Sequence, residues 1–176
     1  MQHCCVQTVS LKSPVGNLHI SGCQEGIHTI QIKTDSGDCE CGCVCADEHQ
    51  ELFAESVKCV SWLRAYFTDP SSTHTLPTPA IHHPILQGGS WTAGVLRVLQ
   101  KSVCVGECVT YTQLASLAGR PRAARAAGGA MRRNPVPLLI PCHRVCLSGG
   151  GAGHYMGGHG DQIKLWLLEH ERKAKH

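Results

Sequence analysis

The sequence lacks three features, each of which would indicate a particular class of protein: long apolar runs, a large net charge of one sign and a secretion signal. No apolar stretch approaches the ~18–20 residues that a membrane-spanning helix needs. The N-terminal residues Met1-Gln2-His3-Cys4 contain neither the basic patch nor the apolar stretch of a secretion signal. The formal net charge of +3 over 176 residues is a weak argument for a nucleic-acid partner. We therefore expect a soluble, intracellular protein.

Cysteine and histidine are abundant, with twelve residues of each, yet no two cysteines have the Cys-x-x-Cys spacing of many zinc sites. In a secreted chain so many cysteines would indicate a disulfide scaffold. An intracellular chain that is 42% hydrophobic can fill a core without one. Thiols, metal ligands or a nucleophile are therefore the better interpretations of the cysteines.

Residues 6–33 alternate apolar and polar side chains, which is typical of half-buried strands. The alternating runs 6–11, 18–20 and 27–32 are separated by turn-forming residues, so we expect antiparallel strands.

A loop is predicted over 34–46, and it contains cysteines at every second position from Cys39 to Cys45. Helical periodicity follows over 47–67, with Asp47 as N-cap and Asp69-Pro70 as the end of the helix.

Prolines and glycines over 70–89 predict a linker between two domains, 1–85 and 86–176. The second half reads as helical, with helices beginning after Ser90 and Thr110, near Pro121 and at 161. The fold class is thus α/β (α+β): an N-terminal domain with an antiparallel sheet and a helix, and a helical, winged-helix-like C-terminal domain.

The helices predicted over 110–117 and 122–127, separated by Gly119, fit a helix-turn-helix. Arginines gather in and around it: Arg120, Arg122, Arg125, Arg132 and Arg133. From this pattern alone, DNA binding and a helical hairpin with a solvated basic face are about equally supported.

Pro141-Cys142-His143-Arg144 is a second candidate site. A thiol becomes a good nucleophile when an imidazole or a cation favours its ionisation. Consecutive side chains rarely face each other, so a water bridge from Cys142 to His143 is favoured over a direct bond. A carboxylate such as Glu169 could orient the far nitrogen of His143. A buried structural cysteine is the alternative.

A third candidate is a metal site near the turn between two predicted strands, where Cys23 and His28 lie with Cys4 in reach. Two cysteines with one or two histidines suit tetrahedral zinc, although this spacing alone is a weak signal.

Nearly the whole chain resembles the O6-alkylguanine-DNA alkyltransferases, in particular the vertebrate type. The motifs that carry the resemblance are Arg125 to Pro137, Ile140-Pro141-Cys142-His143-Arg144-Val145, Gly106-Glu107 to Tyr111, Tyr155-Met156-Gly157-Gly158, Ser13-Pro14-Val15-Gly16, Ser21-Gly22-Cys23 and Ala80-Ile81-His82-His83-Pro84.

This resemblance implies a DNA-repair protein that takes the alkyl group from O6-alkylguanine, and less well from O4-alkylthymine, onto its own Cys142. The reaction is irreversible, occurs once per molecule and requires the base to be flipped out of the duplex. His143 is implied to act through water as the base and Glu169 to orient it. Tyr111 is implied to donate a hydrogen bond to the leaving guanine, and Asn134 to brace the active-site turn.

The resemblance also implies that the second helix of the helix-turn-helix lies in the minor groove and that Arg125 fills the gap left by the flipped nucleotide. The implied DNA-binding residues are Thr92, Tyr111, Thr112, Arg120, Arg125 and Ser148. The partner is double-stranded DNA containing O6-alkylguanine. We expect no membrane, no obligate protein partner, a monomer, and a location in the nucleus.

The same resemblance implies a structural zinc ion held by Cys4, Cys23, His28 and His82, and no organic cofactor. Cys5 and His83 are adjacent competitors for two of these positions. Two features depart from the family pattern. Met156 stands where a small hydroxyl residue is usual and could narrow the entry for bulky groups such as benzyl. Arg120 and Arg133 add positive charge at positions where neutral residues are common in the family, and they predict tighter, more salt-sensitive DNA binding.

Three rival functions remain open at this point. An alkyltransferase-like protein that binds alkylated DNA without repairing it is disfavoured because Cys142 is present. A cysteine hydrolase would leave the basic hairpin unexplained, and a zinc-dependent transcription factor would leave the Pro-Cys-His-Arg segment unexplained.

Overall fold

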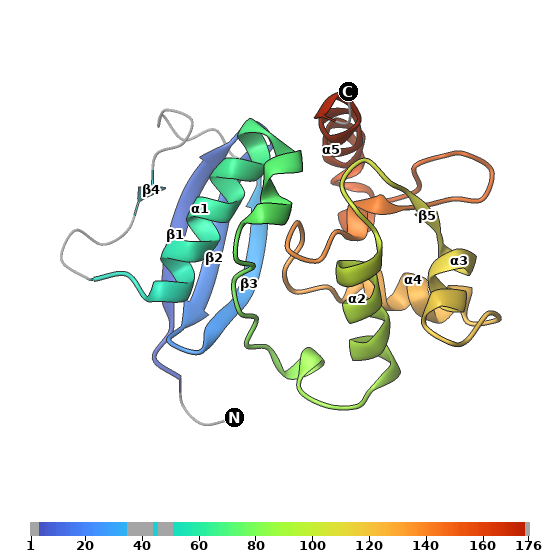
Figure 1. Cartoon of the computed structure of the whole chain (residues 1–176), viewed down its shortest axis with the longest axis horizontal. Coiled ribbons are helices and arrows are strands. Elements are labelled where there is room, and N and C mark those ends of the chain that lie inside the picture. The colour runs from blue at the N-terminus through green and yellow to red at the C-terminus, as the bar shows by residue number, and fades with distance from the viewer. Residues whose placement is uncertain (1–3, 35–43, 46–50, 175–176) are drawn as a thin grey trace. The chain divides into compact units, whose positions relative to one another are not determined.

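The computed structural model describes residues 4–34, 44–45 and 51–174 (Figure 1). The chain divides into two compact units, residues 1–83 and 84–176, whereas the sequence pattern predicts the division after residue 85. Each unit is described by itself. Among the described residues, no helix combines the length and the apolar character needed to cross a membrane.

The first unit is built on an antiparallel sheet of the strand order β3-β2-β1-β4. The strands predicted over 6–33 are confirmed as β1 (Gln7–Ser13), β2 (Gly16–Cys23) and β3 (Gly26–Lys33). Their alternating pattern places one apolar face toward the core, with Leu18 and Ile20 fully buried.

The fourth strand corrects the prediction that 34–46 is entirely loop. Val44–Cys45 form β4, which pairs with Leu11 and Ser10 at the free edge of β1. The edge strand of a sheet has unpaired backbone N–H and C=O groups, so another segment of the chain that pairs with it forms additional hydrogen bonds. The cysteines from Cys39 to Cys43 lie outside the described residues.

The helix α1 (Ala54–Thr68) lies across one face of this sheet (Figure 1). The prediction that it begins at 47 was wrong, and Asp47 lies outside the described residues. Buried Gln7 of β1 explains the later start, because its side chain donates to the Glu51 carbonyl at 3.1 Å and accepts from the Phe53 amide at 3.0 Å. The helix ends where predicted, at Asp69.

Part of the predicted linker belongs to the first unit. After the 3-10 helix η1 (Pro70–Thr75), the chain returns to β3. The Ile27 amide donates to the Ala80 carbonyl and the His82 amide donates to the Ile27 carbonyl, both at 2.8 Å. This pairing fixes His82 beside the start of β3.

The second unit is mainly helical, as predicted. Its elements are η2 (Pro84–Leu86), α2 (Trp91–Ser102), β5 (Val109–Thr110), α3 (Tyr111–Leu117), α4 (Ala124–Arg132), η3 (Cys142–Arg144), β6 (Val145–Cys146), η4 (Met156–Gly158) and α5 (Asp161–Ala174). The predicted caps are confirmed: the Ser90 hydroxyl accepts from the Ala93 amide, and Thr110 and Gln113 form a capping box.

The helix α4 corrects the predicted span 122–127. It begins after Pro121, at Ala124, and it runs through Gly128 and Gly129 instead of ending before them. Glycine costs about 1 kcal/mol relative to alanine inside a helix. The inward side chains of α4, fully buried Ala127 and Ala130, offset that cost by packing in the core.

Candidate active site and metal-binding cluster

The backbone turn that leads to Cys142 is held by Asn134. Its side-chain amide donates to the Ile140 carbonyl at 2.8 Å, and its carbonyl accepts from the Val136 amide at 3.1 Å. Inside the turn, Leu138 adopts a left-handed φ of 74°. The bracing role expected of Asn134 therefore has a physical basis, because its two hydrogen bonds hold a conformation that leucine disfavours.

Cys142 begins the 3-10 turn η3 and lies at the wall of a cavity of about 850 Å³. Its side chain is buried, with 8% of the residue exposed. The lining also includes Tyr111, Arg125, Tyr155 and Met156. The cavity thus brings together a thiol, a phenol hydroxyl and a guanidinium from separate segments of the second unit.

The surroundings of Cys142 act on its ionisation in opposite directions. Burial raises the pKa of the Cys142 thiol above its ordinary value. Hydrogen bonds from Asn134 and Tyr155, together with the nearby charge of Lys164, act to lower that pKa. Lys164 is itself buried, and its ammonium donates to the Val145 carbonyl at 2.6 Å. The site therefore supplies the groups that stabilise a thiolate as it forms.

His143 is fully buried, and its Nε2 atom lies 2.6 Å from Oε1 of Glu171. The prediction that Glu169 orients His143 was wrong. The carboxylate that contacts His143 belongs to the predicted helix, α5, and to a glutamate, but it is Glu171 and not Glu169.

Glu171 is the centre of a buried ionic network. The Arg144 guanidinium donates to both carboxylate oxygens, at 2.9 and 3.0 Å, and the Gly106 amide donates at 3.1 Å. Although burial opposes ionisation of Glu171, its bonds to His143 and Arg144 hold the pKa of the carboxyl well below its usual range. Burial lowers the pKa of His143, and the bond to Glu171 opposes that shift. His143 is therefore neutral, and its Nε2 atom donates a hydrogen bond to the ionised carboxylate of Glu171.

Glu169 points elsewhere because it lies two residues from Glu171 on α5. At about 100° per residue, that offset places the two side chains on opposite sides of a helix. Glu169 keeps 45% of its side chain exposed and accepts two hydrogen bonds from Arg172, each of 2.7 Å. It is a surface ion-pair residue.

The residues expected to contact DNA lie along the helix-turn-helix and its surroundings. Tyr111 and Thr112 form the first turn of α3, and Arg125 lies in the first turn of α4 at the cavity. Ser148 is exposed in the turn that follows β6.

Two arginines reach toward the start of α2. The Arg120 guanidinium lies over the Trp91 ring, 5.8 Å from its centroid. The Arg133 guanidinium donates to the Thr92 hydroxyl at 3.2 Å. Thr92 and Arg120 therefore lie near the same helix N-terminus, together with the additional cation Arg133.

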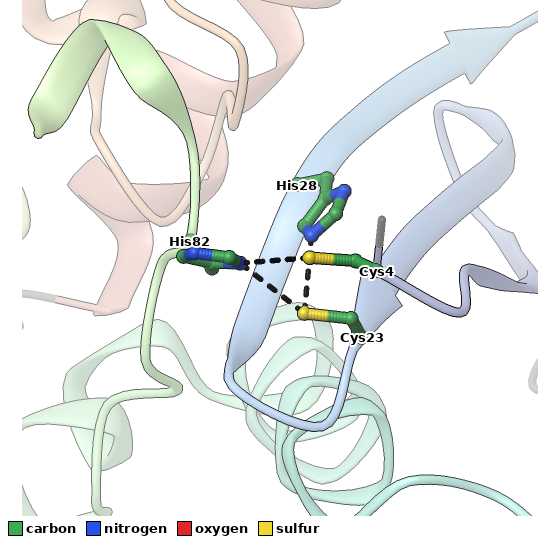
Figure 2. Close-up of side chains that lie close together, drawn as sticks. All are labelled: Cys4, Cys23, His28 and His82. Atoms are coloured by element: carbon green, nitrogen blue, oxygen red, sulfur yellow. Dashed lines mark hydrogen bonds between the residues drawn. The ribbon is translucent and has the colours of Figure 1, made fainter. Parts of the chain in front are cut away.

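In the first unit, the side chains of Cys4, Cys23, His28 and His82 converge (Figure 2). Their ligand atoms all lie within 4.8 Å of one another. The Cys23 sulfur is 3.2 Å from both His82 Nδ1 and His28 Nε2, and the Cys4 sulfur is 3.8 Å from His82 Nδ1. Donor atoms about 2.0–2.3 Å from a central zinc would be separated by similar distances.

The fold explains this convergence. Cys23 ends β2 and His28 lies on β3, and the pairing of residues 80–82 with β3 adds His82. The Cys23 sulfur accepts the Glu25 amide at 3.4 Å, and Glu25 lies 3.2 Å from Nε2 of His82. Contacts of this kind orient ligands from outside a metal centre. The adjacent competitors Cys5 and His83 are outside the cluster.

The second unit thus combines a buried thiol at the wall of a cavity with the helix pair α3 and α4, an arrangement that defines a protein with a candidate cysteine nucleophile beside a helix-turn-helix. The family profile "6-O-methylguanine DNA methyltransferase, DNA binding domain" matches residues 90–173, and the profile for the ribonuclease-like domain of the same proteins matches 8–80. The chain belongs to the 6-O-methylguanine DNA methyltransferase family.

Known relatives agree over most of the chain. Methylated-DNA–protein-cysteine methyltransferase of Mus musculus is 48% identical, covering 92% of this chain and 79% of the relative. The Homo sapiens protein of the same name is 45% identical, covering 96% and 81%. A crystal structure of Mycobacterium tuberculosis OGT in complex with DNA gives a TM-score of 0.71 at 27% identity, covering 94% of this chain and 92% of that chain.

Proposed function

We propose that this chain repairs DNA by moving an alkyl group from the O6 atom of guanine, and less well from O4 of thymine, onto the sulfur of its own Cys142. The observation that carries the proposal is the buried Cys142 at the wall of a cavity beside the helix-turn-helix. The relatives named as methylated-DNA–protein-cysteine methyltransferases support the reaction, and the related structure in complex with DNA supports binding to DNA.

Thiolate formation is the first step. A bridging water takes the proton of Cys142 and passes it toward His143, which is poised to accept it because burial keeps the imidazole neutral. Glu171 fixes the ring through its 2.6 Å contact with Nε2 and stabilises the imidazolium that forms. Asn134 and Tyr155 donate hydrogen bonds to the developing thiolate.

Transfer then exchanges one bond for another. The sulfur–carbon bond forms as the carbon–oxygen bond to O6 breaks, and the electron pair remains on the guanine. The Tyr111 hydroxyl, at the cavity wall, donates toward the base and offsets its growing negative charge. A thioether is a very poor leaving group, so each molecule accepts one alkyl group and is then spent.

Base flipping brings the target atom to the thiol, because O6 lies inside the duplex stack. Arg125 is exposed on the small-residue helix α4 and also lines the cavity. This position suits a side chain that fills the space left by the flipped nucleotide, with α4 in the minor groove. Thr92, Thr112, Arg120 and Ser148 supply further contacts to the DNA backbone.

A structural zinc ion fits the cluster of Cys4, Cys23, His28 and His82. Two thiolates and two neutral imidazoles form a complete tetrahedral set, which is typical of a structural site. When bound, zinc would supply cross-linking of β2, β3 and the segment around His82. We also propose that the protein acts as a monomer in the nucleus, where its substrate is found.

Mass spectrometry after incubation with an O6-methylguanine duplex tests the function. One methyl group, at one equivalent and on the Cys142 peptide alone, is the expected product. Cys142→Ser should retain DNA binding and gain no methyl group. Repeated turnover, or a methyl group on another residue, would contradict the proposal.

A further inference from the structure

Two cysteines outside the proposed reaction lie close together beside the cavity. The strands β5 and β6 pair in parallel, with Val109 opposite Val145 and Thr110 opposite Cys146. This pairing brings Cys108, just before β5, close enough to Cys146 for the two thiols to interact. Both cysteines are free thiols, Cys108 exposed and Cys146 partly exposed. The chain therefore contains a preassembled dithiol.

A bond between Cys108 and Cys146 would join the segments of the chain that carry Tyr111 and Cys142. Cys108 lies three residues before Tyr111, and Cys146 follows the turn that carries Cys142. A covalent link between them would enclose α3, α4 and Cys142 within one loop. It would also join the strand that enters Tyr111 to the strand that leaves Cys142.

Access distinguishes Cys108 from Cys142. Cys108 lines a shallow groove of about 540 Å³ with Thr112 and Leu117, open to a small solute, whereas Cys142 is 8% exposed. Lys164 places a buried cation near the sulfurs of Cys108, Cys142 and Cys146. A cation there favours thiolates as attacking and leaving groups.

We propose that Cys108 and Cys146 close to a reversible intramolecular disulfide when the protein meets a small-molecule disulfide such as oxidised glutathione. The Cys108 thiolate attacks one glutathione sulfur, so that a mixed disulfide forms and one glutathione leaves. The Cys146 sulfur then attacks Cys108, loses its proton to solvent and releases the second glutathione. Two protein thiols are oxidised, and one glutathione disulfide is reduced to two thiols.

The chemistry sets the conditions of this reaction. Partial desolvation of its sulfur, together with the neighbouring groups Cys146 and Glu171, raises the pKa of Cys108 to about 11, against the opposing charge of Lys164. The first step should therefore be slow at neutral pH and faster toward about pH 8.5–9. The second step should be faster, because strand pairing holds the attacking sulfur of Cys146 near Cys108.

Peptide mapping of the full chain tests the proposal. The protein is treated with oxidised glutathione at about pH 8.5, and the remaining thiols are then alkylated. We expect a Cys108–Cys146 linked peptide whose mass is two hydrogens less than the sum of the two free peptides. Cys142 should be recovered in alkylated form. The thermal unfolding midpoint should rise by about 5 °C or more and return on reduction, because the bond restricts the unfolded chain.

Three variants sharpen the test. Cys146→Ser should stop at the glutathione adduct of Cys108, and Cys108→Ser should yield no linked peptide. Cys104→Ser should still form the link, because Cys104 is exposed but outside the pair. A wild-type chain that stops at the mixed disulfide, links Cys142, or forms only intermolecular disulfides would overturn the proposal. None of these readouts depends on alkyl transfer from DNA.

Discussion

The two units use the same side chains, cysteine and histidine, in opposite ways. In the first unit, all four ligand atoms point at a common centre within 4.8 Å of one another. In the second unit, consecutive Cys142 and His143 point apart, the thiol toward a cavity and the imidazole toward Glu171. The first arrangement is closed and suits a structural ion, whereas the second leaves one face of the sulfur for a substrate.

The difference shows that function follows from what surrounds a thiol. The candidate metal cluster is completed by strand pairing, which brings His82 beside cysteine and histidine residues that are distant in the sequence. The reactive site is completed by buried charges, Lys164, Arg144 and Glu171, which control ionisation.

Removing the carboxylate of the reactive site should have the largest effect. Glu171→Gln leaves Arg144 without its buried partner and His143 without its ionised acceptor. We expect the alkyl-transfer rate to fall about 100-fold and the unfolding free energy to fall by about 3–5 kcal/mol. Single-turnover kinetics and urea unfolding measure the two losses.

Glu169→Gln is the matched control on the same helix. Its carboxylate is exposed and pairs only with Arg172 and Lys173 among the contacts described, so both measurements should remain at the wild-type values. Equal losses in the two variants would show that the choice of Glu171 over Glu169 is mistaken.

Removal of the metal should affect the other side of the comparison. With zinc bound, a chelator or Cys23→Ser should lower the thermal midpoint by roughly 5–10 °C, because the ion stabilises only the folded state. The transfer rate per folded molecule should not change, since the cluster belongs to the first unit and Cys142 to the second. A fall in the transfer rate after metal removal, measured at a temperature where the protein stays folded, would contradict the proposal that the cluster contributes to stability and not to alkyl transfer.

Acid should destabilise the buried network in two stages. Burial lowers the pKa of His143 in the folded state, so below its unfolded value of 6.5 only the unfolded chain gains a proton there. The pKa of Glu171 is also lowered on folding, so its contribution is present above its unfolded value of 4.5 and is lost as the pH falls further. The unfolding free energy, followed by urea titration, should decline below about pH 6.5 and more steeply below about pH 4.5. Glu171→Gln should make the steeper stage shallower without abolishing it, because the pKa values of Glu55, Asp161 and Glu169 are also lowered in the folded protein.

Substitution of Met156 tests whether this side chain restricts the size of the alkyl group that can reach Cys142. This residue lines the cavity, is 45% exposed and has a left-handed φ of 52°. Met156→Ser should raise the ratio of benzyl to methyl transfer rates several-fold, up to about tenfold, because a shorter side chain widens the entry. An unchanged ratio would exclude Met156 as the residue that restricts large groups.

The smallest effect is expected at Arg133, on the surface of the same unit. Arg133→Gly should reduce the salt dependence of DNA binding by about one counterion, which is roughly a threefold change between 50 and 200 mM salt. Binding measured over a salt series checks this slope. Leu117→Ala, an exposed apolar change on α3, is a control that should leave the slope unaltered.

Much of the fold followed from local pattern. The strands over 6–33 and the caps Ser90 and Thr110 were predictable because alternation and capping chemistry act over a few residues. The start of α1 was not, because it depends on a hydrogen bond that the Phe53 amide donates to the side chain of Gln7, far away in the sequence. The passage of α4 through Gly128 and Gly129 also depends on packing, which local propensity does not include.

The sequence by itself determined which residue types are available and where the specific motif lies: Cys142 followed by His143, and the cysteines and histidines of the metal cluster. Only the tertiary structure decided which partner each of them meets. Glu171, and not Glu169, faces His143 because the direction of a helical side chain depends on how the helix is rotated against its neighbours. Cys108 and Cys146 likewise become neighbours only in the folded chain, because β5 and β6 pair. Composition and motif define the chemistry that is possible, and packing selects the atoms that perform it.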